Sequence, residues 1–184
     1  MDDMIVSIHQ PNFMPWYPFF QKMAQSDIFV ILKECQFEKN NFQNRFNING
    51  MWNTMSVNKG LEPIKHKEYV DYERDWYKIK KRLPQYNFSL FDRCISKSLM
   101  KTNVCIINKI KNVLGIKCEV VFDYETRLRG TKRLVDICKK YNAKKYLSGP
   151  SGKRYLDISE FDIEVDFFTT KKEDEVGILE LLNV

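Results

Sequence analysis

The sequence has no long apolar run and few glycines or prolines, and these absences exclude several classes of protein. The longest apolar stretches, such as residues 28–32, are far too short to span a bilayer. Seven glycines and six prolines among 184 residues exclude collagen-like and low-complexity chains. The N-terminus has no basic segment with a cleavage site, so we expect no export signal and a cytoplasmic location.

Cysteine and histidine are also scarce. The five cysteines are widely spaced, odd in number and without a C-x-x-C pair, which predicts reduced thiols rather than a disulfide framework or a zinc ribbon. The two histidines, His9 and His66, belong to no metal-ligand pattern, so we expect no metal site. The sequence also lacks the glycine-rich dinucleotide motif and the nucleophile elbow of α/β hydrolases.

The composition is that of a globular protein. Hydrophobic residues make up 43% and charged residues 29%, and the length of 184 residues fits a single domain over residues 1–184. The net charge of +6 suits an anionic partner, from nucleic acid to a nucleotide phosphate. Acids are mixed with the basic residues in stretches such as 73–78, which is more typical of a solvated surface.

Apolar strands and amphipathic helices alternate along the chain. We expect a helix over residues 16–25, with Phe19, Phe20, Met23 and Ala24 as its buried face. The other expected elements are strands at 4–9, 28–32, 118–123, 145–148 and 163–167, and helices at 131–141 and 175–182. This order predicts an α/β fold: a mainly parallel, Rossmann-like sheet flanked by helices, with residues 163–167 at its edge.

The middle of the chain is expected to be different. Asn49-Gly50 lies between two short strands and is a strong hairpin signal. A helical insertion follows over about 72–115, with helices at 72–83 and 90–114, Pro84 between them and Gly115 as the C-terminal cap.

The first candidate site is the loop after the first strand. It carries His9, Gln10 and Asn12 between prolines, and it precedes the N-terminus of a helix. Ligands of open α/β sheets bind outside the carboxyl ends of the strands, and helix N-termini attract anions. The alternative is that His9 caps the helix or satisfies buried backbone groups.

The second candidate site follows the strand at 28–32 and is rich in carboxamides. These side chains suit a ligand rich in hydroxyl or amide groups, and the two cations suit phosphates. The candidate binding residues here are Gln36, Lys39, Asn40, Gln43, Asn44 and Arg45. The alternative is a turn-rich surface in a chain that is generally rich in asparagine. Cys35 has no paired base in the sequence, so a structural thiol is favoured over a nucleophile.

The third candidate site is a loop of small residues after the strand at 145–148. Its glycines allow close approach of the backbone to a ligand, and its hydroxyl and amine groups suit a phosphate. The candidate binding residues here are Ser148, Gly149, Ser151, Gly152, Lys153 and Tyr155. The spacing is not that of a Walker A loop.

Aromatic and basic residues also mix over residues 69–82. Tyr69, Tyr72, Trp76 and Tyr77 beside lysines and an arginine could stack nucleic-acid bases. At helical spacing such aromatics more often belong to the core.

Taken together, these loops resemble the WbqC-like family of bacterial proteins. The blocks that carry the resemblance are residues 8–16 (Ile-His-Gln-Pro-Asn-Phe-Met-Pro-Trp) through 26–27, 29–30, 36–37, 39–40, 42–45 (Phe-Gln-Asn-Arg), 131 with 133–138, 146–153 (Tyr-Leu-Ser-Gly-Pro-Ser-Gly-Lys) and 155–157. The chain departs from the family pattern at residues 33–35, where an acidic pair is common, and after residue 168, where a segment rich in His, Pro and Tyr is common.

The resemblance implies a role in the biosynthesis of O-antigen or another surface glycan. Some members are associated with decorating amino sugars by an acyl or aminoacyl group. The leading hypothesis is therefore N-acyl transfer to a nucleotide-linked amino sugar, with His9 as the base and Gln10 and Asn12 in the catalytic loop. No cofactor is expected to be tightly bound, and the donor would be a thioester on coenzyme A or on a carrier protein. The alternatives are a non-catalytic partner that binds a sugar nucleotide or carrier protein, and, more remotely, a small nucleic-acid-binding domain.

Overall fold

The computed structural model describes residues 4–182 and has an α/β architecture. Its main sheet has five strands in the order β5-β2-β1-β6-β7, and every neighbouring pair is parallel. The strands are β1 (Ile5–His9), β2 (Ile28–Ile31), β5 (Glu119–Phe122), β6 (Lys145–Ser148) and β7 (Glu164–Phe167). The expected mainly parallel sheet flanked by helices is confirmed, and so is the edge position of residues 163–167.

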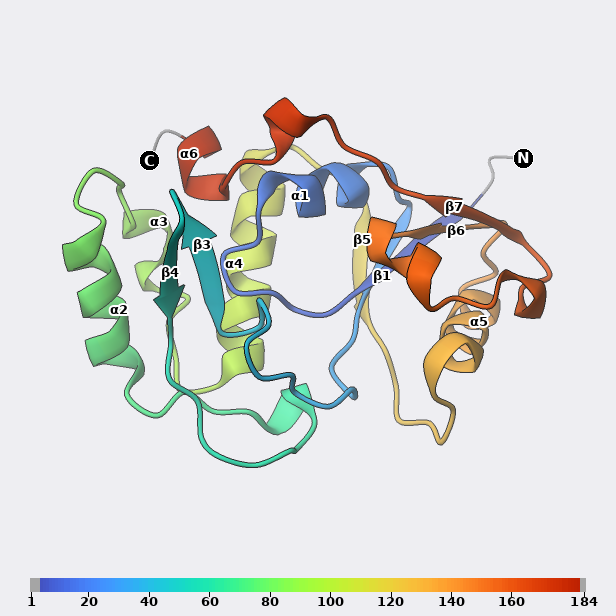
Figure 1. The fold of residues 1–184 in the computed structure, drawn as a ribbon, viewed down its shortest axis with the longest axis horizontal. Helices are drawn as coiled ribbons and strands as arrows, with labels where there is room; N and C mark the ends of the chain where they lie inside the picture. Colours follow the sequence, from blue (N-terminus) through green and yellow to red (C-terminus); the bar gives the residue numbers. More distant parts are fainter. Residues whose placement is uncertain (1–3, 183–184) are drawn as a thin grey trace.

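Alternating residues of the buried strands pack on opposite faces of the sheet. Ile28 and Val30 of β2 belong to one hydrophobic cluster, which includes helix α5 (Gly130–Lys140). Phe29 and Ile31 belong to the other cluster, which includes α1 (Tyr17–Ala24) and α4 (Leu99–Val113). Figure 1 shows α5 on one side of the sheet and α1 and α4 on the other. Because both faces are covered, β2 reads as a continuous apolar run.

Helix α1 connects β1 to β2 and buries a different face from the expected one. Phe19, Phe20 and Met23 are buried as expected, but Ala24 is exposed and Lys22 is buried in its place. Lys22 lies three residues after Phe19, so the 3.6-residue period of the helix brings it onto the apolar face. The expectation for Ala24 was wrong because a small apolar side chain at the end of a helix gains little from burial.

The hairpin forms a second, two-stranded sheet. Strands β3 (Arg45–Ile48) and β4 (Met51–Thr54) are antiparallel. Both turn residues have positive φ, +50° at Asn49 and +78° at Gly50. This is the backbone that a two-residue hairpin turn requires, and it explains the strong signal of the Asn-Gly pair.

The helical insertion lies between this hairpin and β5. Helix α2 (Tyr72–Arg82) agrees with the expected 72–83. The expected single helix over 90–114 is wrong, because it is divided into α3 (Ser89–Asp92) and α4. The side chain of Ser98 caps α4 by accepting from Lys101 N, and this starts a new helix. Gly115 has φ +66° after the end of α4, as its expected cap role requires.

The expectation of five reduced cysteines was also wrong, because Cys94 and Cys105 form a disulfide. Their Cα atoms lie 5.3 Å apart where the turn after α3 meets α4. Spacing in the sequence could not reveal this pair, since the packing of α3 on α4 creates it. Cys35, Cys118 and Cys138 are free thiols.

The C-terminal segment crosses over α1 and returns to the hairpin end of the molecule (Figure 1). This segment follows β7 and carries η4 (Lys172–Asp174) and α6 (Ile178–Leu182). The short helices η2 (Pro150–Arg154) and η3 (Ile158–Glu160) lie between β6 and β7, and η1 (Ile64–His66) precedes α2. Helix α6 begins three residues later than the expected 175–182. Among residues 4–182, no helix is long and apolar enough to cross a membrane.

Candidate functional site

A cleft lies at the carboxyl edge of the main sheet. From β1 the chain proceeds to β2 and β5 on one side, and β6 and β7 lie on the other side, so the strand order reverses between β1 and β6. Such a switch point is where open α/β sheets bind ligands. The cleft has a volume of about 900 Å³, and its walls come from the ends of β1 and β6, the loop after β2, η2 and the segment 168–175.

The cleft collects part of the residue set that the sequence predicted. All three residues of the first loop, His9, Gln10 and Asn12, line it. From the third loop, Gly149, Ser151 and Tyr155 line it. The other predicted residues do not line the cleft; they are Gln36, Lys39, Asn40, Gln43, Asn44, Arg45, Ser148, Gly152 and Lys153.

The two buried carboxamides of the second loop hold the site in place. Gln43 Oε1 accepts from Glu38 N at 3.1 Å, and Gln43 Nε2 donates to Gln10 Oε1 at 2.8 Å. Asn44 Nδ2 donates to Met55 O at 2.8 Å. Both side chains thus have partners within the protein, and they position the loop rather than face the cleft.

A buried asparagine of α4 joins the first two loops. Asn103 Nδ2 donates to Pro11 O and to Gln43 O, each at 2.7 Å, and its Oδ1 accepts from Tyr69. The helical insertion therefore holds the first two loops of the site together through Asn103. Sequence reasoning missed Asn103, because its only signal is a polar residue on the apolar face of a helix.

The remaining predicted binding residues of the second loop do not line the cleft. Gln36, Lys39 and Asn40 are exposed, and Asn40 O accepts from the guanidinium of Arg45. The Arg45 guanidinium lies over the Trp52 ring, 4.0 Å from its centroid. The two cations that the sequence assigned to phosphates therefore lie outside the cleft.

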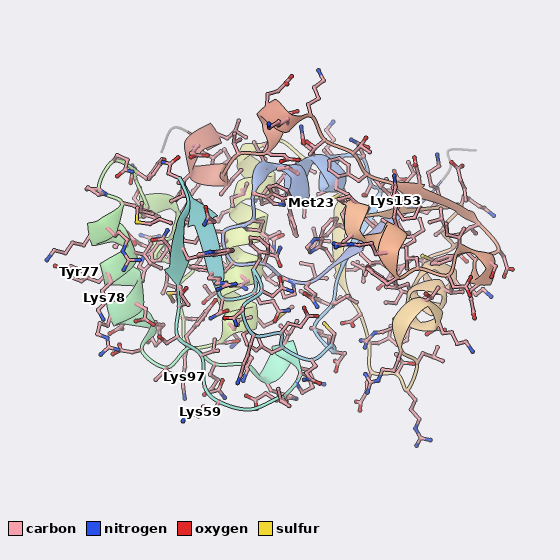
Figure 2. All side chains as sticks on the ribbon, viewed as in Figure 1. Met23, Lys59, Tyr77, Lys78, Lys97 and Lys153 are labelled. Atoms are coloured by element: carbon pink, nitrogen blue, oxygen red, sulfur yellow. A yellow bond between two sulfur atoms is a disulfide. The ribbon has the colours of Figure 1, made fainter. Side chains whose placement is uncertain are left out.

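In the third loop, close packing explains one of the glycines. A Cβ at Gly152 would collide with Ser148 Oγ, so a larger residue there would displace η2. Ser148 is buried and donates to Gly149 O at 3.2 Å. Lys153 is exposed, with its Nζ 5.4 Å from the Phe167 ring centroid; Figure 2 labels it at η2.

His9 ends β1 and is half-buried against the edge of Phe19, with ring centroids 4.8 Å apart. Its Nδ1 lies 2.9 Å from Gln10 O. Because a carbonyl oxygen only accepts, Nδ1 carries the proton of the neutral ring and Nε2 keeps a lone pair. Burial, and then the positive charge of Lys22, lower the His9 pKa to about 3. The imidazole is therefore neutral at neutral pH.

Lys22 lines the same cleft, and sequence reasoning missed it. Its side chain is 2% exposed, and Nζ donates to Ile8 O at 3.1 Å. Burial lowers the Lys22 pKa to about 7. The available signal was the spacing from Phe19, which places Lys22 on the buried face of α1.

Glu38 adds a carboxylate to the cleft, and sequence reasoning missed it as well. Its oxygens accept from Gln10 Nε2 at 3.1 Å and from Asn41 Nδ2 at 2.5 Å. These bonds link Glu38 through Gln10 to the end of β1 and fix its position in the cleft. Arg154 and Glu175 are further charged residues of the lining that had not been predicted.

Aromatic side chains form the rim of the cleft. Trp16, Phe42 and Tyr155 all line it and are 44%, 46% and 62% exposed. Exposed aromatic rings provide flat surfaces for sugar rings or nucleotide bases. Only Tyr155 of the three was among the predicted binding residues.

Cys35 does not line the cleft, although its Sγ accepts from Gln10 Nε2 at 3.8 Å, and it is a poor nucleophile. Burial, and then the charge of Asp123, raise its thiol pKa to about 11, so the thiol is protonated at neutral pH. The expectation of a structural thiol agrees with this environment. Among residues 4–182, no group of three His, Cys, Asp or Glu side chains is placed to hold a metal ion.

The basic-aromatic segment does not form a stacking surface. Tyr69 and Trp76 are buried in the core, where Trp76 Nε1 donates to Asp92 at 2.7 Å. Tyr77 is 62% exposed and projects with Lys78 from the outer face of α2 (Figure 2). One exposed ring cannot stack successive bases, so this geometry does not favour nucleic-acid binding.

Comparison with known proteins identifies relatives of this chain. A family model described as the WbqC-like protein family matches residues 10–175. The uncharacterized protein Rv1507c of Mycobacterium tuberculosis (strain ATCC 25618 / H37Rv) is 31% identical over 180 residues, which span 85% of this chain and 77% of that protein. No solved structure matches. With a match over almost its whole length, this chain belongs to the WbqC-like protein family.

Proposed function

We propose that this protein is an enzyme of bacterial surface-glycan biosynthesis that transfers an acyl or aminoacyl group to the amine of a nucleotide-linked amino sugar. The observation that carries the proposal is a neutral His9, with a free lone pair on Nε2, in the same cleft as the Glu38 carboxylate. Gln10 joins the two, because it follows His9 and donates to Glu38. The volume of about 900 Å³ is sufficient for a sugar with its phosphates.

In this reaction the two groups act on one amine. Glu38 accepts a hydrogen bond from the acceptor amine and orients it. The amine nitrogen attacks the carbonyl carbon of a thioester donor, so that a C–N bond forms and the C–S bond breaks. The nitrogen becomes acidic as it gains positive charge, and His9 Nε2 takes its proton and passes it to the leaving thiolate.

The low pKa of His9 keeps its Nε2 lone pair free of a proton throughout the neutral range. An imidazole of ordinary pKa would be partly protonated near pH 6.5, and its lone pair would then be occupied. Burial keeps His9 neutral. The donor is a thioester on coenzyme A or on a carrier protein, and the aromatic rim provides surfaces for the sugar or the base.

The proposal is tested with the purified full chain, a panel of nucleoside-diphosphate amino sugars, and acetyl and glycyl thioesters. Mass spectrometry follows the amide product, and a thiol reagent follows the leaving group. We expect turnover with one acceptor and a loss of about 10²- to 10⁴-fold in His9→Asn. His66→Asn is the matched control, because His66 is exposed and does not line the cleft.

Two outcomes would contradict the proposal. A loss below tenfold in His9→Asn would remove His9 from the role of base. Tight binding of a sugar nucleotide with no amide product from any donor would favour a non-catalytic binding protein instead.

A further inference from the structure

Lys22 is a buried cation without an acidic partner. Among residues 4–182 its one hydrogen-bond acceptor is Ile8 O, and no carboxylate lies within ion-pair distance of Nζ. The ring of Phe29 is its other close neighbour, with the centroid 5.5 Å from Nζ. An ammonium group has three donors, so Lys22 retains hydrogen-bonding capacity for a group outside the protein.

Lys67 shows how this fold satisfies a buried lysine that has only a structural role. Its Nζ donates to Asn58 O at 2.8 Å, to Gly60 O at 2.9 Å and to Glu62 Oε1 at 3.3 Å. Lys67 is 1% exposed, as Lys22 is 2% exposed, but Lys67 does not line the cleft. Lys22, which has N–H donors without acceptors in the described part of the protein, is thus the buried lysine of the two that lines the cleft.

Burial of Lys22 is costly for the protein alone. An ammonium in an apolar environment loses its hydration, and one carbonyl oxygen and one aromatic ring compensate for only part of that loss. An unbranched apolar side chain such as methionine would fill the same space at lower cost. The charge is therefore better explained by an anionic ligand than by packing.

The groups that face Lys22 from other elements are compatible with an anion. His9 of β1 lines the same cleft, interacts with the charge of Lys22 and is neutral. On the other walls, Arg154 and Ser151 of η2 offer donors, while Glu38 and Glu175 are the carboxylates. Neither carboxylate pairs with Lys22. Cations and a hydroxyl around one space suit the several oxygens of a phosphate better than the two of a carboxylate.

We propose that the ligand places a phosphate group beside Lys22, and that the Lys22 ammonium, rather than Lys39 or Arg45, is the counter-ion of that phosphate. The ligand class, a nucleoside-diphosphate sugar, rests on the proposed function; the position of the phosphate rests on Lys22 itself. This contact should couple ligand binding to the uptake of a proton. A phosphate stabilises the charged form of the amine, so binding above pH 7 draws a proton onto Lys22.

The test is calorimetric binding to the full chain of five nucleoside diphosphates (adenosine, guanosine, cytidine, uridine and deoxythymidine) and of the matching nucleosides. Between pH 7.5 and 9 the phosphates have already lost their protons, since their last pKa is about 6. We expect at least one diphosphate to bind at least tenfold more tightly than its nucleoside. Its affinity should fall by up to tenfold per pH unit, with uptake approaching one proton in buffers of different ionisation enthalpy.

Variants assign the effect to this side chain. Lys22→Met should weaken binding of the diphosphate at least tenfold and abolish proton uptake. Lys22→Arg should keep the affinity and lose its pH dependence, because a guanidinium remains charged throughout this range. Lys109→Met is the control, because it removes one exposed lysine of α4 outside the cleft and should leave binding unchanged.

Equal binding of the diphosphates and their nucleosides would overturn the inference, and so would unchanged diphosphate affinity in a folded Lys22→Met. The readout needs no turnover. Phosphate binding through Lys22 without acyl transfer would therefore contradict the proposed function and leave this inference intact. Acyl transfer that does not depend on Lys22 would support the proposed function and contradict this inference.

Discussion

Gln43 donates from its amide nitrogen to Oε1 of Gln10 at 2.8 Å, and this bond joins the loop after β2 to the end of β1. Gln43 is fully buried, and its oxygen accepts from Glu38 N. Gln10 in turn donates to the Glu38 carboxylate. The three side chains form one network that fixes the acidic side of the cleft.

Removing Gln43 should therefore destabilise the fold. Gln43→Leu would leave the Glu38 amide and the Gln10 oxygen without their partner, at a cost of about 1–3 kcal/mol in the free energy of unfolding. Urea unfolding measures this cost. Gln36→Leu is the matched control, because Gln36 is exposed, and it should change stability by less than about 0.5 kcal/mol. Equal effects of the two substitutions would contradict the network.

A buried ion pair fixes the other side of the same loop. Asp123 pairs with Arg133 of α5, and its Oδ1 accepts from Lys33 N at 2.7 Å and from Glu34 N at 3.2 Å. Asp123→Asn should cost about 3–5 kcal/mol, because it leaves a buried guanidinium without its partner. Asp162→Asn, in an exposed pair with Lys139, should cost less than about 1 kcal/mol by the same urea measurement. A small loss in Asp123→Asn would show that the loop does not depend on this pair.

Lys22 should make the stability of the fold depend on pH. Its pKa is about 7 in the folded chain against an ordinary 10.5, so between these values the unfolded chain binds a proton that the folded chain does not. Stability then increases with pH across this window, and the charged lysine costs about 5 kcal/mol below it. Lys22→Met should be more stable than the parent at pH 6, with a gap that closes toward pH 10. Urea unfolding at several pH values tests this, and a gap independent of pH would contradict it.

His9 should make the stability of the fold depend on pH in the acid range. Its folded pKa of about 3 lies below the ordinary 6.5, so between these values only the unfolded chain binds the proton. Stability is lost as the pH falls through this window, by roughly 5 kcal/mol at most. His9→Asn removes this contribution, so its acid unfolding should begin at a lower pH than that of the parent, followed by circular dichroism. His66→Asn should unfold as the parent does; identical acid curves for all three proteins would contradict the burial of His9.

The sequence was sufficient to predict the frame of the molecule. Apolar runs such as β2 and the Asn49-Gly50 turn are local signals. Such signals were enough to predict the positions of the strands, the hairpin and most helices. The placement of His9 and Gly149 in one cleft followed from topology, because both lie at the carboxyl ends of parallel strands.

The rest depended on packing that no local pattern records. Lys39 and Arg45 have the charge that a phosphate needs, but the hairpin turns Arg45 toward Trp52. The helical period places Lys22 on the apolar face of α1, but that period does not show that the ammonium group itself would be buried at a cleft. The disulfide arises where the turn after α3 meets α4, and spacing along the chain does not determine that contact.

The measurement that tests the central claim most directly is thermal unfolding of the protein and of Trp16→Ala with nucleoside-diphosphate amino sugars and the bare nucleotides. A ligand at about 100 times its dissociation constant adds roughly 2.7 kcal/mol, which raises the midpoint by several degrees. We predict such a rise with one amino-sugar nucleotide and a smaller rise in Trp16→Ala, because Trp16 is exposed at the rim of the cleft. No rise with any sugar nucleotide, or an equal rise in the variant, would contradict the assignment of this cleft.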